Sequence, residues 1–212
     1  MRITVFGAAG QVGSRAVAEA LARGHEVTAV LRSPARAHEV PLAAEVRIGD
    51  AATIEDVVDL SVGQDLVISA TRPAPGREAE LVTATKVLLA GLARTGVRLL
   101  VVGGAATLTM PGTAGVTVMD DPEFPATLLG IARACADQLE ACRADTGADW
   151  AYLSPPALLE PGRRTGRYRL GADDLLVDPA GESVISMEDL AMALLDEAER
   201  PAHCRVRFTV AY

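Results

Sequence analysis

Three glycines near the start of the chain, Gly7, Gly10 and Gly13, have the spacing needed to hold a phosphate group against the backbone. They follow a short apolar segment, residues 2–6, and precede a segment with helical spacing of apolar residues. In such a turn the first glycine permits the bend, the second lets a pyrophosphate approach, and the third lets the helix pack on the strand. The free amides of the helix then face the phosphates. The turn therefore predicts binding of a nicotinamide dinucleotide.

The second strand is predicted at residues 26–31. The residues that follow it indicate which dinucleotide binds. A site that prefers NAD usually has Asp or Glu there for the ribose 2′-hydroxyl, whereas a site for NADP uses Arg and short hydroxyl side chains for the phosphate. The chain has Arg32, Ser33 and Arg36, and residues 30–36 include no carboxylate. We therefore predict NADP(H) rather than NAD(H). The alternative is that these arginines are ordinary exposed residues of a surface loop.

Further contacts are expected at the ends of the later strands, because ligands of open α/β sheets lie at the carboxyl ends of the strands. Each of these positions could also be an ordinary turn. In chain order they are Asp50 and Ala51 for the adenine, Ala70, Thr71 and Arg72 for the ribose or pyrophosphate, and Gly103 and Gly104 for the nicotinamide.

The elements that must position these residues alternate along the chain. Strands are predicted at residues 2–6, 26–31, 45–48, 66–70, 97–102, 150–153 and 205–210. Helices are predicted at residues 11–23, 53–60, 77–94, 126–145 and 186–199, with a short one opening at 33–36. Residues 103–125 and 160–171 are predicted to be loops. This order predicts an α/β fold, a Rossmann-type doubly wound parallel sheet with helices on both faces. We interpret residues 1–212 as one domain in which 154–212 form a smaller, irregular substrate-side region.

Composition narrows the class of protein. Half of the residues are hydrophobic and 3% are aromatic, which suits a parallel sheet built from aliphatic side chains. A net charge of −8 disfavours nucleic-acid binding. No apolar run approaches the roughly 20 residues that span a bilayer, and no signal peptide is evident, so we expect a cytoplasmic protein without membrane contact. The three cysteines match no metal-binding spacing, and no metal is expected.

Over nearly its whole length the chain resembles the NAD(P)H-binding atypical short-chain dehydrogenases. Within them it is similar to proteins provisionally named NADH-flavin reductases and to biliverdin reductase B, a flavin reductase, with NmrA-like regulators more distant. The resemblance lies in the glycine turn, Val30-Leu31-Arg32 with Arg36, Gly49-Asp50-Ala51, Val102-Gly103-Gly104-Ala105, Leu153-Ser154-Pro155 and residues 164–169, 185–189 and 207–210.

The resemblance implies a pyridine nucleotide lying over the sheet and a flat, conjugated small molecule stacked on its nicotinamide. One departure is Ala9, where biliverdin reductase B has Thr, which removes a possible hydroxyl contact. The implied contacts are Gly10, Gln11, Val12 and Gly13 with the pyrophosphate, Arg32 and Arg36 with the 2′-phosphate, Asp50 and Ala51 with the adenine, and Gly103 and Gly104 under the nicotinamide.

The Tyr and Lys pair with which typical short-chain dehydrogenases protonate a ketone is missing. The only lysine is Lys86, and Val82 stands four residues before it. Where the pair would lie, the expected register has Ala132 and Ala136. Hydride transfer to a flavin or a similar ring tolerates this absence, because the ring spreads the negative charge and can take its proton from water.

Three further features could contact the acceptor. The hydroxyls of Thr107 and Ser154 flank the predicted site and could donate a hydrogen bond, or be ordinary turn residues. The arginine-rich segment, residues 163–169, could bind an anionic acceptor such as a flavin phosphate, or be a solvated basic loop. The leading hypothesis is an NADPH-dependent reductase of the flavin-reductase type. The alternatives are an NADP(H)-sensing regulator without catalysis and a reductase or isomerase of one specialised metabolite.

Overall fold

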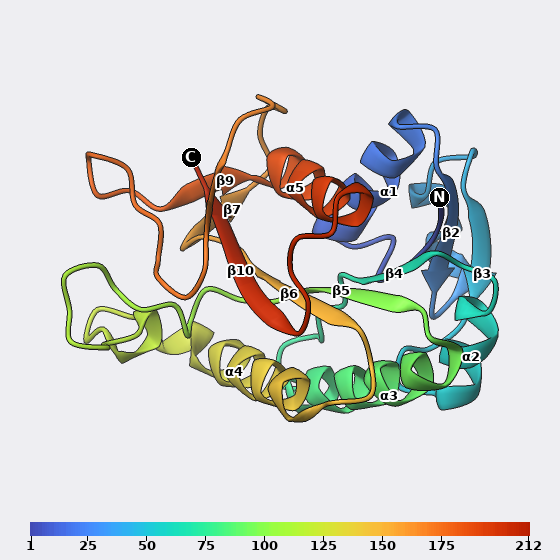
Figure 1. The fold of residues 1–212 in the computed structure, drawn as a ribbon, viewed down its shortest axis with the longest axis horizontal. Coiled ribbons are helices and arrows are strands. Elements are labelled where there is room, and N and C mark those ends of the chain that lie inside the picture. Colours follow the sequence, from blue (N-terminus) through green and yellow to red (C-terminus); the bar gives the residue numbers. More distant parts are fainter.

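Eight strands form the central sheet of the computed structural model, which describes residues 1–212 (Figure 1). Their order across the sheet is β3-β2-β1-β4-β5-β6-β10-β8, and every neighbouring pair is parallel except β10 with β8. The bounds are β1 Arg2–Phe6, β2 Glu26–Leu31, β3 Glu45–Ile48, β4 Leu66–Ser69, β5 Arg98–Val102, β6 Trp150–Ser154, β8 Arg169–Gly171 and β10 Val206–Ala211. The chain reverses its direction of travel across the sheet between β1 and β4, and the carboxyl ends of these two strands form the crevice in which such folds bind ligands.

Helices cover both faces of the sheet (Figure 1). On one face lie α1 (Gln11–Ala22) and α5 (Met187–Glu199), and on the other lie α2 (Ile54–Ser61), α3 (Ala79–Thr95) and α4 (Leu129–Ala144). Successive strand residues point to opposite faces, so Val5 packs in the α1 and α5 core while Phe6 packs in the other. A sheet buried on both faces needs the continuous aliphatic strands that this composition supplies. No helix of the structure combines the length and apolar character that crossing a bilayer requires.

The Rossmann-type doubly wound sheet is confirmed, and most predicted bounds hold to within two residues. The last strand begins at Val206 because Arg205 has φ of 52°, outside the extended region. The predicted helix at 126–145 begins with a 3₁₀ turn, Ala126–Leu128, before α4.

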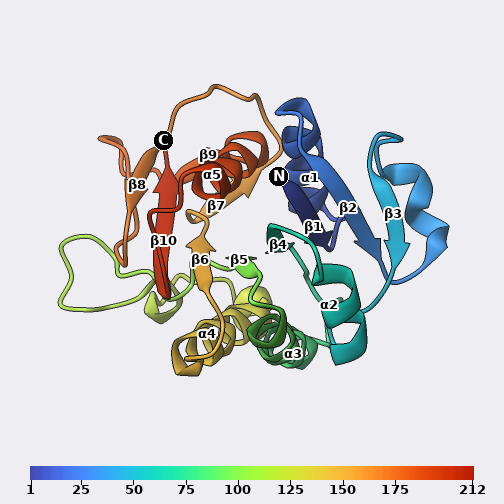
Figure 2. The ribbon, with the colours of Figure 1, turned by 45° about the vertical axis from the view of Figure 1, so that its right-hand side comes forward.

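The predicted loop at 160–171 is wrong at its first residue, which belongs to a strand, and in its last three residues, which form β8. A second sheet of two parallel strands, β7 (Leu158–Glu160) and β9 (Val184–Ser186), was also not predicted. Figure 2 shows β3 at one end of the molecule, with β8, β7 and β9 toward the other. Three-residue strands are too short to show a periodic apolar pattern, so the sequence did not reveal them.

Candidate functional site

The glycine turn after β1 brings the ends of β1 and β4 and the start of α1 into contact. Gly7 has φ of +80°, and a Cβ there would lie 2.5 Å from the backbone oxygen of Ala70. A Cβ at Gly13 would overlap the backbone oxygen of Gly7. Gly10 precedes α1 in an extended conformation, and its amide donates to Gly7 at 2.8 Å. Any side chain at Gly7 or Gly13 would therefore push the helix away from the strands.

The first amides of α1 are available to a ligand. The backbone N–H groups of Gln11, Val12 and Gly13 have no acceptor in the protein, and Gly10 carries no side chain that could cap the helix. Unpaired amides at a helix N-terminus together with the helix dipole favour a bound anion. The turn is thus a cradle with three free donors. A pyrophosphate fits these features.

Arg36 folds back onto the glycine turn. Its Nη2 donates to the backbone oxygen of Ala9 at 2.6 Å, and its Nε and Nη2 donate to the carboxylate of Glu39 at 2.7 and 2.6 Å. The Oγ of Ser33 accepts from the amide of Ala35 and starts the short 3₁₀ helix Pro34–Glu39. That helix brings Glu39 back beside Arg36. A carboxylate therefore lies next to the predicted phosphate site, although residues 30–36 contain none.

Arg32 lies directly after β2 and is more loosely held. Its Nη1 is 3.9 Å from Glu80 of α3, and well over half of its side chain is exposed. Such an exposed pair contributes little to stability, so the guanidinium of Arg32 can move toward another anion at small cost.

The predicted adenine contacts are built into a turn. The amide of Asp50 donates to Asp56 at 2.8 Å, and Oδ1 of Asp50 accepts from the amide of Ala52 at 2.9 Å. Ala51 is buried in the core between the sheet and α2 and α3. Asp50 therefore has one carboxylate oxygen, Oδ2, without a partner, whereas the Ala51 side chain is turned to the core.

The residues after β4 border the glycine turn. The backbone of Ala70 packs against Gly7, and the hydroxyl of Thr71 lies 3.3 Å from that of Ser69. Arg72 is exposed and has no carboxylate within ion-pairing distance. A free guanidinium two residues after Ala70, whose backbone contacts Gly7, adds positive potential to this edge of the sheet, which favours a pyrophosphate.

The glycines after β5 make room for core side chains. A Cβ at Gly103 would overlap the ring of Tyr152, and a Cβ at Gly104 would lie 2.9 Å from the Sγ of Cys135. The hydroxyl of Tyr152 lies 3.1 Å from the oxygen of Cys135 and 3.2 Å from Oε1 of Gln138. Burial raises the pKa of Tyr152 well above its usual value. This tyrosine, which the sequence analysis did not single out, is therefore a buried neutral donor.

Thr107 and Ser154 lie in different environments. Thr107 is a partly exposed residue, and its hydroxyl accepts a hydrogen bond from Nη1 of Arg207 at 2.8 Å. Arg207 is itself buried and paired with Asp173. Ser154 is fully buried, and its Oγ has no hydrogen-bond partner. Thr107 is thus reachable by a ligand, whereas Ser154 is enclosed at the end of β6.

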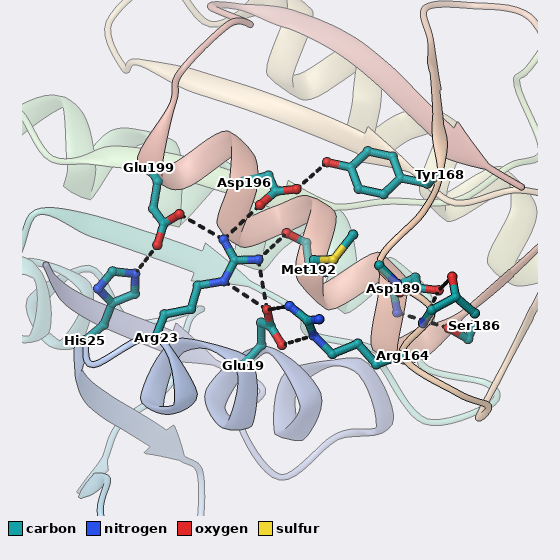
Figure 3. A network of polar contacts seen from close by, with 12 residues as sticks. Glu19, Arg23, His25, Arg164, Tyr168, Ser186, Asp189, Met192, Asp196 and Glu199 are labelled. Carbon is teal, nitrogen blue, oxygen red and sulfur yellow. Dashed lines mark hydrogen bonds and ion pairs between the residues drawn. The ribbon is translucent and has the colours of Figure 1, made fainter.

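The arginine loop, residues 163–169, forms hydrogen bonds with other parts of the chain (Figure 3). Arg164 reaches across to Glu19 of α1 with two hydrogen bonds of 2.8 and 2.7 Å. Those bonds, opposed by burial, lower the pKa of Glu19. Arg169 donates to the backbone oxygen of Tyr212 at 2.8 Å. Arg163 and Arg167 have no ion pair, so they are the arginines of this loop that an anion could recruit.

Two shallow hollows lie on the same side as the arginine loop. The larger, of about 390 Å³, is lined by Thr165, Arg167, Tyr168, Arg169 and Tyr212, and the other, of about 180 Å³, lies between α5 and β10. No predicted cofactor contact lines either of them.

A doubly wound parallel sheet with a glycine cradle at its switch point defines a Rossmann-type dinucleotide-binding protein. The sequence pattern of the NAD(P)H-binding family matches residues 7–201, and the chain belongs to this family. A nicotinamide dinucleotide is therefore its class of cofactor.

Three relatives are similar over their whole length. The uncharacterized protein YwnB of Bacillus subtilis is 38% identical over 99% of this chain and 98% of its own. A solved structure from Streptococcus pneumoniae, provisionally named an NADH-flavin reductase, is 33% identical with a TM-score of 0.89, covering 100% of this chain and 99% of its own. One from Bacteroides thetaiotaomicron, provisionally named an epimerase, is 39% identical with a TM-score of 0.91, covering 100% and 96%.

Proposed function

We propose that this protein is an NADPH-dependent oxidoreductase of the flavin-reductase type, which reduces a flavin or a similar conjugated acceptor. The observation that carries the proposal is the cradle of Gly7, Gly10 and Gly13 with the free amides of Gln11, Val12 and Gly13. Arg72 adds a free positive charge beside it. These donors would hold the pyrophosphate and fix the cofactor across the ends of β4 and β5.

The 2′-phosphate of NADPH would bind between Arg32 and Arg36, with the hydroxyl of Ser33 as a further donor. Ser33 Oγ accepts from an amide, so its own proton is free for a phosphate oxygen. Arg32 is loosely paired and can turn toward the phosphate. Asp50, with one free carboxylate oxygen, and the backbone of Ala51 would lie against the adenine.

When bound, the cofactor supplies a hydride from its nicotinamide to the acceptor ring. The protein offers no Tyr and Lys pair for protonation: Lys86 is exposed on α3, and Tyr152 is buried with its hydroxyl bonded. The hydroxyls of Tyr168 and Tyr212 are bonded to Asp196 and Asp189. Catalysis would then rest on orientation, with the backbone of Gly103 and Gly104 as the floor, and an acceptor able to take its proton from water.

Two hydroxyls remain candidates for orienting the acceptor. Thr107 accepts from Arg207 and can donate its own proton to an acceptor carbonyl. Ser154 has a fully buried Oγ without a partner, so it would donate to the acceptor only after the residues that enclose it move. We place the activity in the cytoplasm, where the three free cysteines would stay reduced.

The test is the loss of NADPH absorbance when FMN or riboflavin is added to the purified protein without oxygen. Turnover of one NADPH per flavin reduced supports the proposal. Tight NADPH binding with no turnover of any flavin or quinone would favour the sensing regulator. One similar structure is provisionally named an epimerase, which is the reason to test the isomerase alternative. Conversion of a metabolite with catalytic amounts of the cofactor and without its net oxidation would favour that alternative.

A further inference from the structure

The guanidinium of Arg36 is already occupied on two sides. Nε and Nη2 donate to the two carboxylate oxygens of Glu39, at 2.7 and 2.6 Å, and Nη2 also donates to the backbone oxygen of Ala9 at 2.6 Å. Ala9 is part of the glycine turn, so the Arg36–Glu39 pair borders the phosphate cradle directly. None of the roles proposed above uses Glu39.

The bond between Arg36 and Glu39 has the geometry that a phosphate would need. A carboxylate and a phosphate present the same fork of oxygens to a guanidinium. The hydrogen bond from Arg36 lowers the pKa of Glu39, so this carboxylate is ionised near neutral pH. A 2′-phosphate must therefore displace Glu39 or share Arg36 with it, close to a negative charge. A 2′-hydroxyl, as in NADH, needs no such exchange.

We propose that Glu39 limits the preference for NADPH over NADH by competing with the 2′-phosphate for the guanidinium of Arg36. Glu39 is thus a positioning residue that acts through Arg36 and need not touch the cofactor. The inference rests on the proposed function only in that a nicotinamide dinucleotide places its adenosine ribose beside Arg36. We therefore expect the protein to bind both NADPH and NADH. The ratio of the two affinities should be smaller than Arg32 and Arg36 would give without Glu39.

The test is a Glu39→Gln substitution in the full chain, which keeps the size of the side chain and one acceptor oxygen but removes the charge. Calorimetry should show NADPH binding about threefold to tenfold more tightly, since the lost competitor is a partly exposed charge, while NADH changes by less than about twofold. Adenosine 2′,5′-bisphosphate and 5′-AMP, which differ by the 2′-phosphate alone, should repeat this contrast without any turnover.

Glu140→Gln is a matched control. Glu140 forms an exposed ion pair with Arg143, three residues away at 2.8 Å, which reproduces the spacing of the Arg36–Glu39 pair on a different helix. Glu140→Gln removes one negative charge, as Glu39→Gln does, but at a position away from the cradle. We expect it to leave the affinity for both dinucleotides unchanged.

The double variant shows whether Glu39 acts through Arg36. In an Arg36→Gln background, Glu39→Gln should no longer change the ratio of the NADPH and NADH affinities. A ratio that shifts equally in both backgrounds overturns the inference, as does an equal gain for both dinucleotides or no gain for NADPH. If the wild-type protein binds no dinucleotide at all, the proposed function fails first, and the inference falls with it.

Discussion

Arg207 on β10 donates a hydrogen bond from Nη1 to the hydroxyl of Thr107 at 2.8 Å, although 100 positions separate the two residues. Nη1 also donates to the backbone oxygen of Thr107 at 3.1 Å, and Nε donates to Asp173 at 2.8 Å. The buried guanidinium thus fixes the loop after β5 against the last strand. Because the Thr107 oxygen accepts from Arg207, its proton is left to point elsewhere, which suits a donor to a bound acceptor.

We expect Arg207→Gln to lower the free energy of unfolding by about 1–3 kcal/mol, since hydrogen bonds to a charged group are lost in a buried place. If Thr107 orients the acceptor, kcat for flavin reduction should also fall about tenfold, with NADPH affinity unchanged. Urea unfolding and steady-state kinetics measure the two effects.

Arg143→Gln is the control for Arg207, because Arg143 also lies near Asp173, at 3.5 Å, but is half exposed. It should change stability by less than about 0.5 kcal/mol. A loss of stability in Arg207→Gln without any loss of kcat would show that Thr107 has only a structural role.

Gly13→Ala should abolish dinucleotide binding. The new Cβ would overlap the backbone oxygen of Gly7, so α1 must move off the strands and its amides leave the cradle. We expect a loss of about 2 kcal/mol or more in unfolding free energy, as in other overpacked sites, and no heat of binding with NADPH.

Gly130→Ala is the matched substitution, because Gly130 also lies in the first turn of a helix, and its Cβ would be an ordinary 3.5 Å from Glu78. It should stabilise the protein by about 0.5–1 kcal/mol and leave binding intact. Full NADPH binding by Gly13→Ala would contradict the assignment of the cradle.

Tyr152→Phe tests catalysis without a tyrosine acid. The hydroxyl of Tyr152 is buried against Cys135 and Gln138, so its removal should cost about 1–2 kcal/mol of stability. The kcat for flavin reduction should stay within about twofold of the wild-type value at every pH measured. Tyr168→Phe, whose hydroxyl bonds Asp196, should behave likewise. A hundredfold loss of kcat in a folded Tyr152→Phe would mean that this tyrosine takes part in the chemistry.

Asp189 links stability to pH. Burial acts to raise the pKa of this carboxyl, but hydrogen bonds from Thr165 and Tyr212 outweigh it and hold the pKa below its usual value. The stabilisation is therefore complete above the unfolded pKa of about 3.9 and is lost as the pH falls through the lower folded value. Asp189→Asn should cost about 2–4 kcal/mol near neutral pH, and the difference from the wild type should shrink in acid.

Unfolding by urea at a series of pH values measures the Asp189 effect. Asp137→Asn on the exposed face of α4 should leave the curve unchanged. An Asp189→Asn variant whose deficit stays constant down to strongly acid pH would contradict the lowered pKa.

The sequence was enough to predict every strand of the central sheet except β8, because the predicted strands are largely aliphatic segments next to glycines or turns. Positions 26–31 and 45–48 were predicted with the bounds that β2 and β3 have. The glycine turn was equally readable, since a strand, Gly7, Gly10, Gly13 and a helix lie next to one another along the chain.

The parts that were not predicted depend on tertiary contacts. Glu39 lies beside Arg36 only because a 3₁₀ helix turns the chain back, and the sequence did not show that the same guanidinium also bonds Ala9. Gly103 was predicted to lie under the nicotinamide, but the sequence did not show that a Cβ there would overlap Tyr152, about fifty positions later in the chain. Pairings over such distances leave no local periodicity.

The contacts of α1 with α5 and the arginine loop have a consequence for biosynthesis. Arg23, directly after α1, bonds Asp196 of α5 across 173 positions, and Glu19 of α1 bonds Arg164 across 145 (Figure 3). The side of α1 that faces α5 and Arg164 is therefore uncovered until the last quarter of the chain has left the ribosome. The core that α1 shares with α5, which includes Val17, Ala20, Leu190 and Leu194, is then incomplete, so we expect nascent chains that stop before α5 to expose apolar residues and to recruit chaperones. We expect nucleotide binding to begin only after translation has passed residue 199.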